Sequence, residues 1–301
     1  MVKSSAIKIL TLKNKSTDNL RFNYELLSNT KFNMLGHARH YISVVQPEEV
    51  YTTKKTEQDK IANLFSNLDN LITLHQRKYD KLVNVKKALL EKMFPKNDSN
   101  VPEIRFKGFT EAWEQRKLNE YLETSTEKNE KGIYTKEDVL SVSGDVGIVN
   151  QIELQGRSFA GSSVLNYGIV NKNDVVYTKS PLKINPYGII KTNKGKTGIV
   201  STLYAIYHPK NGTNSNFVQT YFEDNYRLNK YLHPLVNKGA KNDMKVSDDN
   251  ALLGSVIFPN YNEQTKISEM FEVLDNLITL HQRKLEKLKN IKKSLLEKMF
   301  V

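Results

Sequence analysis

A long internal duplication constrains this sequence more than any other feature. Residues 57–95 and 263–301 align at an offset of 206, and 27 of the 39 aligned positions are identical. The stretch from Asp69 to Lys78 recurs unchanged as Asp275 to Lys284. A solenoid needs a short period and at least three units, so two copies this far apart indicate one structural element that is used twice.

Each copy has the apolar spacing of a long helix. Positions that alternate between steps of four and three residues form a heptad seam, which is typical of a coiled coil. In the first copy these positions are Leu68, Ile72, His75, Tyr79, Leu82, Lys86, Leu89 and Met93. Neither copy contains glycine, and the only proline, Pro95, stands where the first helix would stop. We therefore predict two helices of about 35 residues, each about 50 Å long.

The two predicted helices could pack separately on their own domains or pair with each other. Separate packing would constrain only the apolar stripe, yet the polar face is repeated almost as closely. The repetition therefore favours a pair joined by an insert of domain size. His75 and His281 fall on the seam without a neighbouring cluster of ligands, so we interpret them as tolerated seam residues and predict no metal site.

The segment 96–262 has the character of a mixed, mainly β domain. A turn-rich linker at 95–102 opens it, and β-rich runs follow at 139–142, 174–178 and 198–207. Gly, Asn and Pro punctuate these runs at short intervals. An aromatic-rich stretch at 216–232 predicts a helix near the end of the domain.

The positive charge of the chain is concentrated in one part of this domain. The whole chain has 45 Lys and Arg against 33 Asp and Glu, a formal net charge of +12, which suggests a polyanionic partner. Residues 96–171 hold 9 basic and 12 acidic residues, a net of −3, whereas residues 172–245 hold 12 basic and 4 acidic, a net of +8.

Lysines and short polar side chains in the basic part are candidates for contacts with DNA phosphates and base edges. The alternative is that the lysines form ordinary solvated surface. The candidates are Lys179, Ser180, Lys183, Asn185, Lys191, Lys194, Lys196, Ser201, Thr202, Tyr204, Lys238, Lys241, Asn242 and Lys245.

Sequence features argue against several other classes of protein. The chain has no cysteine, which excludes disulfides and thiolate chemistry. No apolar run approaches the roughly 20 residues of a membrane span, and the start lacks a signal-peptide pattern, so we predict a cytoplasmic location. The stretches at 185–188 and 195–197 are incomplete versions of methyltransferase and phosphate-loop motifs. We therefore predict a binding protein with no catalytic residues and no cofactor of its own.

Particular motifs resemble the DNA-specificity subunits of type I restriction–modification systems. Residues 105–110 with Trp113-Glu114-Gln115-Arg116-Lys117-Leu118 resemble the opening of their target-recognition domains. Pro259, then Glu263-Gln264 and a helix ending Leu-Leu-Glu-Lys-Met-Phe, resemble the domain exit and spacer helix. The resemblance covers essentially the whole chain. It implies an α+β fold, with a mainly β target-recognition domain and two long helices paired as an antiparallel coiled coil.

The resemblance also implies a function and a set of partners. Specificity subunits of this kind read split DNA sites and direct adenine methylation and restriction by other subunits. The expected partners are double-stranded DNA, methyltransferase subunits and a motor-nuclease subunit. S-adenosylmethionine would be bound by the methyltransferase and not by this chain.

The chain departs from the family pattern at its beginning. We predict one complete target-recognition domain at 96–262, spacer helices at 57–95 and 263–301, and only the C-terminal remnant of a first domain at 1–56. Residues 35–44 weakly echo residues 238–246, which supports the remnant. This arrangement predicts self-association or pairing with another specificity subunit. The alternative is a coiled-coil scaffold or an inactive recombination fragment that binds methyltransferase subunits without reading DNA.

Overall fold

The computed structural model describes residues 10–32, 45–47, 49–96, 99–238 and 244–300. The chain divides into two compact units. Unit 1 consists of Met1–Val83 and Asn276–Val301, and unit 2 consists of Asn84–Asp275. The echo at 35–44 lies outside the described residues. No helix in the described ranges is both long and apolar enough to span a bilayer.

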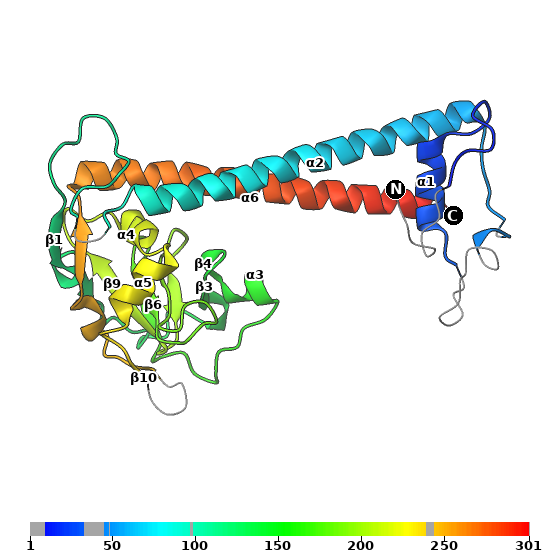
Figure 1. The fold of residues 1–301 in the computed structure, drawn as a ribbon. Coiled ribbons are helices and arrows are strands. Elements are labelled where there is room, and N and C mark those ends of the chain that lie inside the picture. Colours follow the sequence, from blue (N-terminus) through cyan, green and yellow to red (C-terminus); the bar gives the residue numbers. More distant parts are fainter. Residues whose placement is uncertain (1–9, 33–44, 48, 97–98, 239–243, 301) are drawn as a thin grey trace. The chain divides into compact units, whose positions relative to one another are not determined.

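The two copies of the repeat form the long helices that the sequence predicts. They are α2 (Lys55–Lys92) and α6 (Tyr261–Met299), and each begins two residues before the predicted start. Figure 1 draws both as long helical ribbons, and each contributes residues to both units. The antiparallel pairing is also as predicted, and it is seen within unit 1, where Asp69 lies opposite Lys292 at 2.7 Å and His75 opposite His281 at 2.8 Å.

The same ion pair forms twice between the helices, once in each unit. In unit 1 Asp69 of α2 pairs with Lys292 of α6, and in unit 2 Lys86 of α2 pairs with Asp275 of α6 at 2.5 Å. Asp275 is the repeat counterpart of Asp69, and Lys292 is that of Lys86. Each helix therefore supplies the aspartate of one ion pair and the lysine of the other. Two helices of near-identical sequence can exchange these roles only when they run antiparallel.

Unit 2 is built around an antiparallel sheet of four strands in the order β2-β9-β6-β7. The strands are β2 (Leu122–Thr124), β9 (Tyr204–Pro209), β6 (Val175–Thr178) and β7 (Ile190–Thr192). Alternation along β6 sends Val175 and Tyr177 to the main core, and Val176 to a second cluster on the other face. Because both faces are covered, the strand is buried along its whole length.

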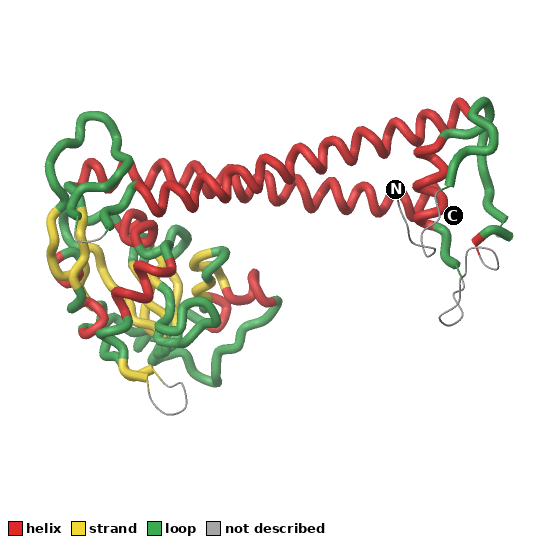
Figure 2. Tube along the Cα trace, in the orientation of Figure 1, coloured by secondary structure: helices red, strands yellow, loops and turns green. Residues whose placement is uncertain are grey.

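The described part of unit 2 also contains four two-stranded antiparallel sheets, whose strands are among those coloured yellow in Figure 2. They pair β1 (Glu114–Lys117) with β12 (Ser255–Phe258), β3 (Leu140–Ser143) with β4 (Gly147–Asn150), β5 (Gly168–Val170) with β8 (Gly198–Val200), and β10 (Asn237–Lys238) with β11 (Met244–Lys245). A short helix, α3 (Gln151–Gln155), follows β4 and has Asn150 as its N-cap. The prediction of a mixed, mainly β domain is thereby confirmed.

The aromatic-rich stretch 216–232 does not form the single helix that was predicted. It forms α4 (Ser215–Tyr221) and α5 (Asn225–Leu232), which both pack on the main core. Asp224 separates them because its carboxylate accepts a hydrogen bond from the Arg227 amide at 2.7 Å and caps α5. The β-rich run 198–207 is likewise divided, by a turn at 201–203 between β8 and β9.

The regular elements in the described part of unit 1 are helices. Besides the ends of α2 and α6, it contains α1 (Leu20–Asn29), which buries Phe22 and Leu26 against Ala62 of α2. The Asn19 side chain caps α1 by accepting a hydrogen bond from the Phe22 amide at 3.1 Å.

Candidate nucleic-acid interface

Two loops of unit 2 emerge at the same end of the four-stranded sheet. Strands β6 and β9 are antiparallel, and Thr178 at the end of β6 faces Tyr204 at the start of β9. Loop 179–189 comes after β6, and loop 201–203 precedes β9, so both lie at this end. The Lys179 amide donates a hydrogen bond to the Leu203 carbonyl at 2.9 Å and joins them. We call this region the loop end of the sheet.

The structure divides the predicted DNA-contact residues between opposite ends of the sheet. Lys194 and Lys196 come after β7 and lie at the other end, beyond Thr192, which faces Val175. Lys191 lies within β7. Those at the loop end are Lys179, Ser180, Lys183, Asn185, Ser201, Thr202 and Tyr204.

Two of the loop-end residues are held by contacts within the protein. The Lys179 ammonium lies 2.8 Å from a carboxylate oxygen of Asp248 and is mostly buried. Tyr204 is half-buried, and burial raises the pKa of its hydroxyl. These side chains shape the loop end, whereas Lys183 and Thr202 are exposed on it.

Loop 179–189 has a fixed backbone. The Leu182 and Gly188 amides both donate to the Asn185 carbonyl at 3.0 Å, and the Asn185 side chain accepts from Asn229 of α5 at 3.2 Å. Gly188 has φ +91°, and a Cβ there would lie 2.0 Å from the Thr178 carbonyl oxygen. Only glycine fits at this position, because the returning chain passes directly against the end of β6.

Lysines beyond the loop end differ in their accessibility. The Lys191 ammonium is largely buried beside Glu223, at 3.7 Å, and burial lowers its pKa. Lys194 lies 3.9 Å from Glu272 of α6, and Lys196 is exposed.

The remaining candidates belong to the β10–β11 hairpin or to its connection. Lys238 ends β10, and Lys245 ends β11. Lys241 and Asn242 lie outside the described residues.

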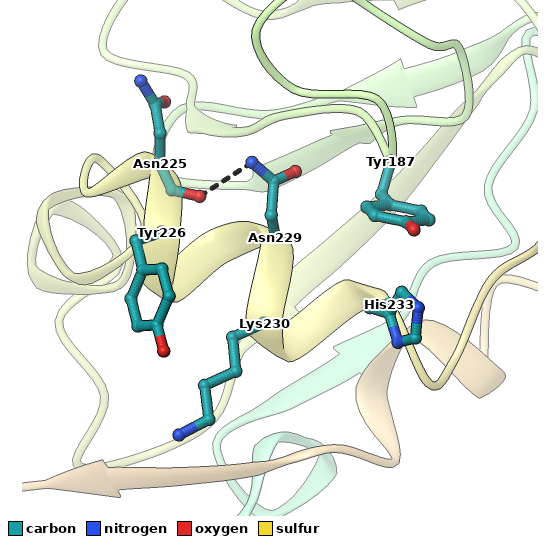
Figure 3. A pocket seen from close by; sticks show the side chains of 6 residues that line it. All are labelled: Tyr187, Asn225, Tyr226, Asn229, Lys230 and His233. Carbon is teal, nitrogen blue, oxygen red and sulfur yellow. Dashed lines mark hydrogen bonds between the residues drawn. The ribbon is translucent and has the colours of Figure 1, made fainter. Parts of the chain in front are cut away.

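Sequence reasoning missed a hollow beside the loop end that is lined by α5 and loop 179–189. Its volume is about 370 Å³, and its lining residues are Tyr187, Asn225, Tyr226, Asn229, Lys230 and His233 (Figure 3). The Tyr187 and His233 rings meet edge to face, with centroids 5.5 Å apart, and Tyr226 is 77% exposed. The aromatic richness of 216–232 indicated a helix, but it did not indicate which rings face outward.

Exposed apolar side chains lie among the polar ones at the loop end. Leu182, Ile184 and Leu203 are all exposed there. Exposed aliphatic and aromatic groups beside lysines can contact sugars and thymine methyl groups, while the lysines contact phosphates.

The motifs that resembled catalytic sequences have structural roles. Residues 185–188 form the turn at the tip of loop 179–189. In the stretch 195–197, the Gly195 amide donates to the Asn193 side-chain oxygen at 3.1 Å, and the Lys196 carbonyl accepts from the Asn193 side chain at 3.0 Å. Within the ranges that the structure describes, no three His, Asp or Glu side chains gather as a metal site would require.

Comparisons with known proteins identify the fold. No protein-family model matches the sequence. The HsdS subunit from Thermoanaerobacter tengcongensis matches with a TM-score of 0.50 and 14% identity, over 95% of this chain and 71% of that chain. The S subunit of a type I restriction-modification system from M. genitalium matches with a TM-score of 0.57 and 13% identity, over 96% of this chain and 74% of that one. The chain therefore has the fold of type I specificity subunits, as the sequence motifs predicted.

Proposed function

We propose that this chain is a non-catalytic DNA-specificity subunit, which reads one part of a DNA site through the loop end of unit 2. The observation that carries the proposal is the specificity-subunit fold, which extends over 95% of the chain or more in both comparisons. Methylation of adenine and cleavage of DNA would be carried out by partner subunits.

The chemistry of the loop end supports DNA as the ligand. Lys183 and Lys230 supply positive charge, Ser180, Asn185 and Thr202 supply hydrogen-bonding groups, and the net charge of residues 172–245 is +8. Charge of this kind gives affinity for phosphates that falls as salt is raised, whereas polar and apolar groups at fixed positions distinguish bases. Lys191 is left out of the proposed surface because its ammonium is buried beside Glu223.

The proposed partners are those of a specificity subunit. The paired helices α2 and α6 would bind the methyltransferase subunits, which hold S-adenosylmethionine, and a motor-nuclease subunit would join them in the cytoplasm. Residues 1–56 would be the C-terminal part of a first target-recognition domain, with 96–262 as the complete one. A two-part DNA site would then require self-association or a second specificity subunit.

The test is to map N6-methyladenine across a genome with the methyltransferase alone and with the methyltransferase plus this chain. We expect a new methylated motif that depends on the chain. A palindromic motif would indicate two copies of the chain, and unlike halves would indicate a second specificity subunit. If no motif appears although the chain co-purifies with the methyltransferase, it is a scaffold or an inactive fragment and the proposal fails.

A further inference from the structure

Helix α1 of unit 1 has the same place on the repeat as helix α4 of unit 2. Gln58 and Gln264 occupy the same repeat position, at the starts of α2 and α6. The Gln58 side chain accepts a hydrogen bond from the Asn19 amide at 2.8 Å, and the Gln264 side chain accepts one from the Asn214 amide at 3.0 Å. Asn19 caps α1, and Asn214 caps α4. The two helices are therefore anchored in the same way.

The donor side of each glutamine repeats this arrangement. The Gln58 amide donates to the Thr17 carbonyl at 3.3 Å, and the Gln264 amide donates to the Gly212 carbonyl at 3.4 Å. Thr17 lies two residues before Asn19, just as Gly212 lies two residues before Asn214. Both glutamines are buried. The correspondence therefore includes the chain leading into each helix as well as its first turn.

Aromatic rings pack under both helices at matching positions. A phenylalanine one turn into the short helix meets a phenylalanine just after the end of one long helix, which in turn meets a phenylalanine inside the other long helix, with centroid separations of 5.3 to 6.2 Å. The rings are Phe22, Phe65 and Phe300 in unit 1, and Phe217, Phe271 and Phe94 in unit 2. The inner face of α1 is thus packed as the inner face of α4 is packed.

The outer face of α4 is covered by the sheet of unit 2. The Thr192 amide of β7 donates to the Gln219 side chain at 2.9 Å, and the Thr192 hydroxyl donates to the Ser215 carbonyl at 2.7 Å. Val218 and Phe222 enter the main core beside them and are fully buried. The β-sheet body therefore covers the positions 215, 218, 219 and 222.

The corresponding face of α1 is largely open, with two of its four residues exposed and two half-buried. It consists of Leu20, Asn23, Tyr24 and Leu27, which we call the outer face of α1. Leu20 is 61% exposed and Tyr24 is 59% exposed, whereas their counterparts Ser215 and Gln219 are 7% and 8% exposed. The face that is open on α1 in unit 1 is therefore the face that the β-sheet body covers on α4 in unit 2.

We propose that the outer face of α1 is a docking surface for the β-sheet body of a target-recognition domain carried by a separate polypeptide. This inference rests on the proposed function, because the occupant is a second DNA-reading body. The partner would have strands equivalent to β2, β9, β6 and β7 but no helix equivalent to α4, so that its own apolar sheet face is open.

The length of the connecting chain indicates where the partner should end. Strand β9 ends at Pro209, five residues before Asn214. The residue five before Asn19 is Asn14, so the segment from Lys15 onward corresponds to the chain after β9 in unit 2. The same alignment matches residues 9–14 to β9, so a partner with its own equivalent of β9 would take the place of those residues and lead into Lys15.

A second copy of this chain is a poorer occupant. Its sheet is already covered by its own α4. Two α1 helices packed on each other would be about 15 Å long, and a contact that short would not reach the roughly 1,200 Å² of a stable interface.

The first experiment uses the full chain and a probe polypeptide of residues 96–209, which carries the sheet but lacks α4. The probe is co-expressed with three tagged forms of the chain: native, the α4-matched variant L20S/N23V/Y24Q/L27F, and the blocked variant L20K/Y24K. We expect the matched variant to retain at least tenfold more probe than the blocked variant, with the native chain between them. Equal retention by all three forms, with soluble probe, would overturn the proposal.

A second experiment does not depend on the probe being stable alone. Residues 96–209 are joined directly to Lys15 in place of residues 1–14, which reproduces the chain order of unit 2. Hydrogen exchange of the α1 amides should slow at least tenfold relative to the native chain, and modification of the Tyr24 ring should be lost. Unchanged exchange and modification would count against docking, as would a dimer of the native chain that the L20K/Y24K variant dissociates.

Failure of the docking proposal is distinguishable from failure of the proposed function. The L20K/Y24K variant leaves the loop end of unit 2 unchanged, so its salt-dependent binding to duplex DNA should match that of the native chain. A native chain that docks the probe but binds no DNA contradicts the proposed function alone. A chain that binds DNA but never docks the probe contradicts this inference alone.

Discussion

Lys86 lies in the helix seam of unit 2 and is held there by two carboxylates. Its ammonium is 2.5 Å from Asp275 and 2.6 Å from Glu223. Burial alone would lower the pKa of Lys86, but the two carboxylates outweigh burial and raise it. For Glu223, burial alone would raise the pKa of the carboxyl group, but Lys191 and Lys86 outweigh burial and lower that pKa. This lysine breaks the apolar pattern of the seam because one carboxylate from α6 and one from the connection between α4 and α5 contact it.

Replacing Lys86 should therefore weaken unit 2 strongly. In the variant Lys86→Met, Glu223 and Asp275 lose a counter-charge that lies in direct contact with both of them, which should cost about 3 kcal/mol of unfolding free energy. Urea unfolding followed by circular dichroism measures the loss. Lys293→Met, which changes a mostly exposed side chain on α6, serves as the control and should leave the midpoint unchanged. Similar midpoints for both variants would show that the contacts of Lys86 with Glu223 and Asp275 do not stabilise unit 2.

The His75–His281 contact predicts a pH dependence of stability. The pKa of His281 lies below its ordinary value because of partial burial and because His75, Lys78 and Lys284 lie nearby. The folded chain therefore takes up this proton less readily than the unfolded chain. Stability should be fully present above about pH 6.5, the ordinary pKa of histidine, and should fall as the pH drops below it.

Thermal unfolding at pH 5.5 and pH 7.5 measures this dependence. The native chain should lose more Tm between the two values than the variant His281→Gln loses. The variant His75→Gln, which removes the neighbouring imidazole, should also lose less than the native chain. If the acid loss is the same in all three chains, the histidine contact does not contribute to it.

At the scale of elements, the duplicated helices were the easiest part to predict. A 39-residue repeat with heptad spacing and no glycine allows few structures other than a helix, and repetition of the polar face indicated that the two copies pair. The division of 216–232 was not predicted because Asp224 is compatible both with a helix and with a cap. Asp224 acts as a cap because its side chain accepts a hydrogen bond from the Arg227 amide, and composition does not reveal this contact.

The candidate DNA surface was predictable only in part. The sequence located the positive charge but could not distinguish Lys183, which is exposed at the loop end, from Lys191, which is buried beside Glu223. That distinction depends on which strand faces which helix. Tyr187 and Lys230 line the same hollow, but this could not be predicted because α5 and loop 179–189 come together only in the folded domain.

The buried glutamines at the starts of α2 and α6 predict that the two units can be weakened separately. Gln58→Leu leaves the Asn19 amide and the Thr17 and Thr53 carbonyls without their partner, at a cost of about 1–3 kcal/mol. Limited proteolysis should then cut near α1 while unit 2 remains intact.

Gln264→Leu is the matched substitution and should have the reverse effect. It removes the equivalent contacts to Asn214, Gly212 and Pro259 in unit 2. Hydrogen exchange resolved by peptide should show faster exchange in α4 for this variant, and in α1 for Gln58→Leu. If both variants affect the same unit, the two glutamines are not equivalent.

At the scale of the whole molecule, the surplus of positive charge predicts strong salt dependence of DNA binding. Each lost phosphate contact reduces the magnitude of the negative slope of log K against log salt concentration by about 0.9. With both ammonium groups on phosphates, the double variant Lys183→Ala/Lys230→Ala should therefore reduce the magnitude of the slope by about 1.8. The matched variant Lys194→Ala/Lys196→Ala, at the other end of the sheet, should leave the slope near that of the native chain. The opposite ranking would place the DNA at the other end of the sheet.

The exchange of roles between α2 and α6 has a consequence for how such genes can change. A crossover between the codons for Asp69–Lys78 and those for Asp275–Lys284 would join the two helices in frame at the same repeat position. The resulting hybrid helix would keep its heptad spacing, while the chain would lose or gain a block of 206 residues. Recognition domains could therefore be deleted, duplicated or traded between genes without redesigning the helix that carries them.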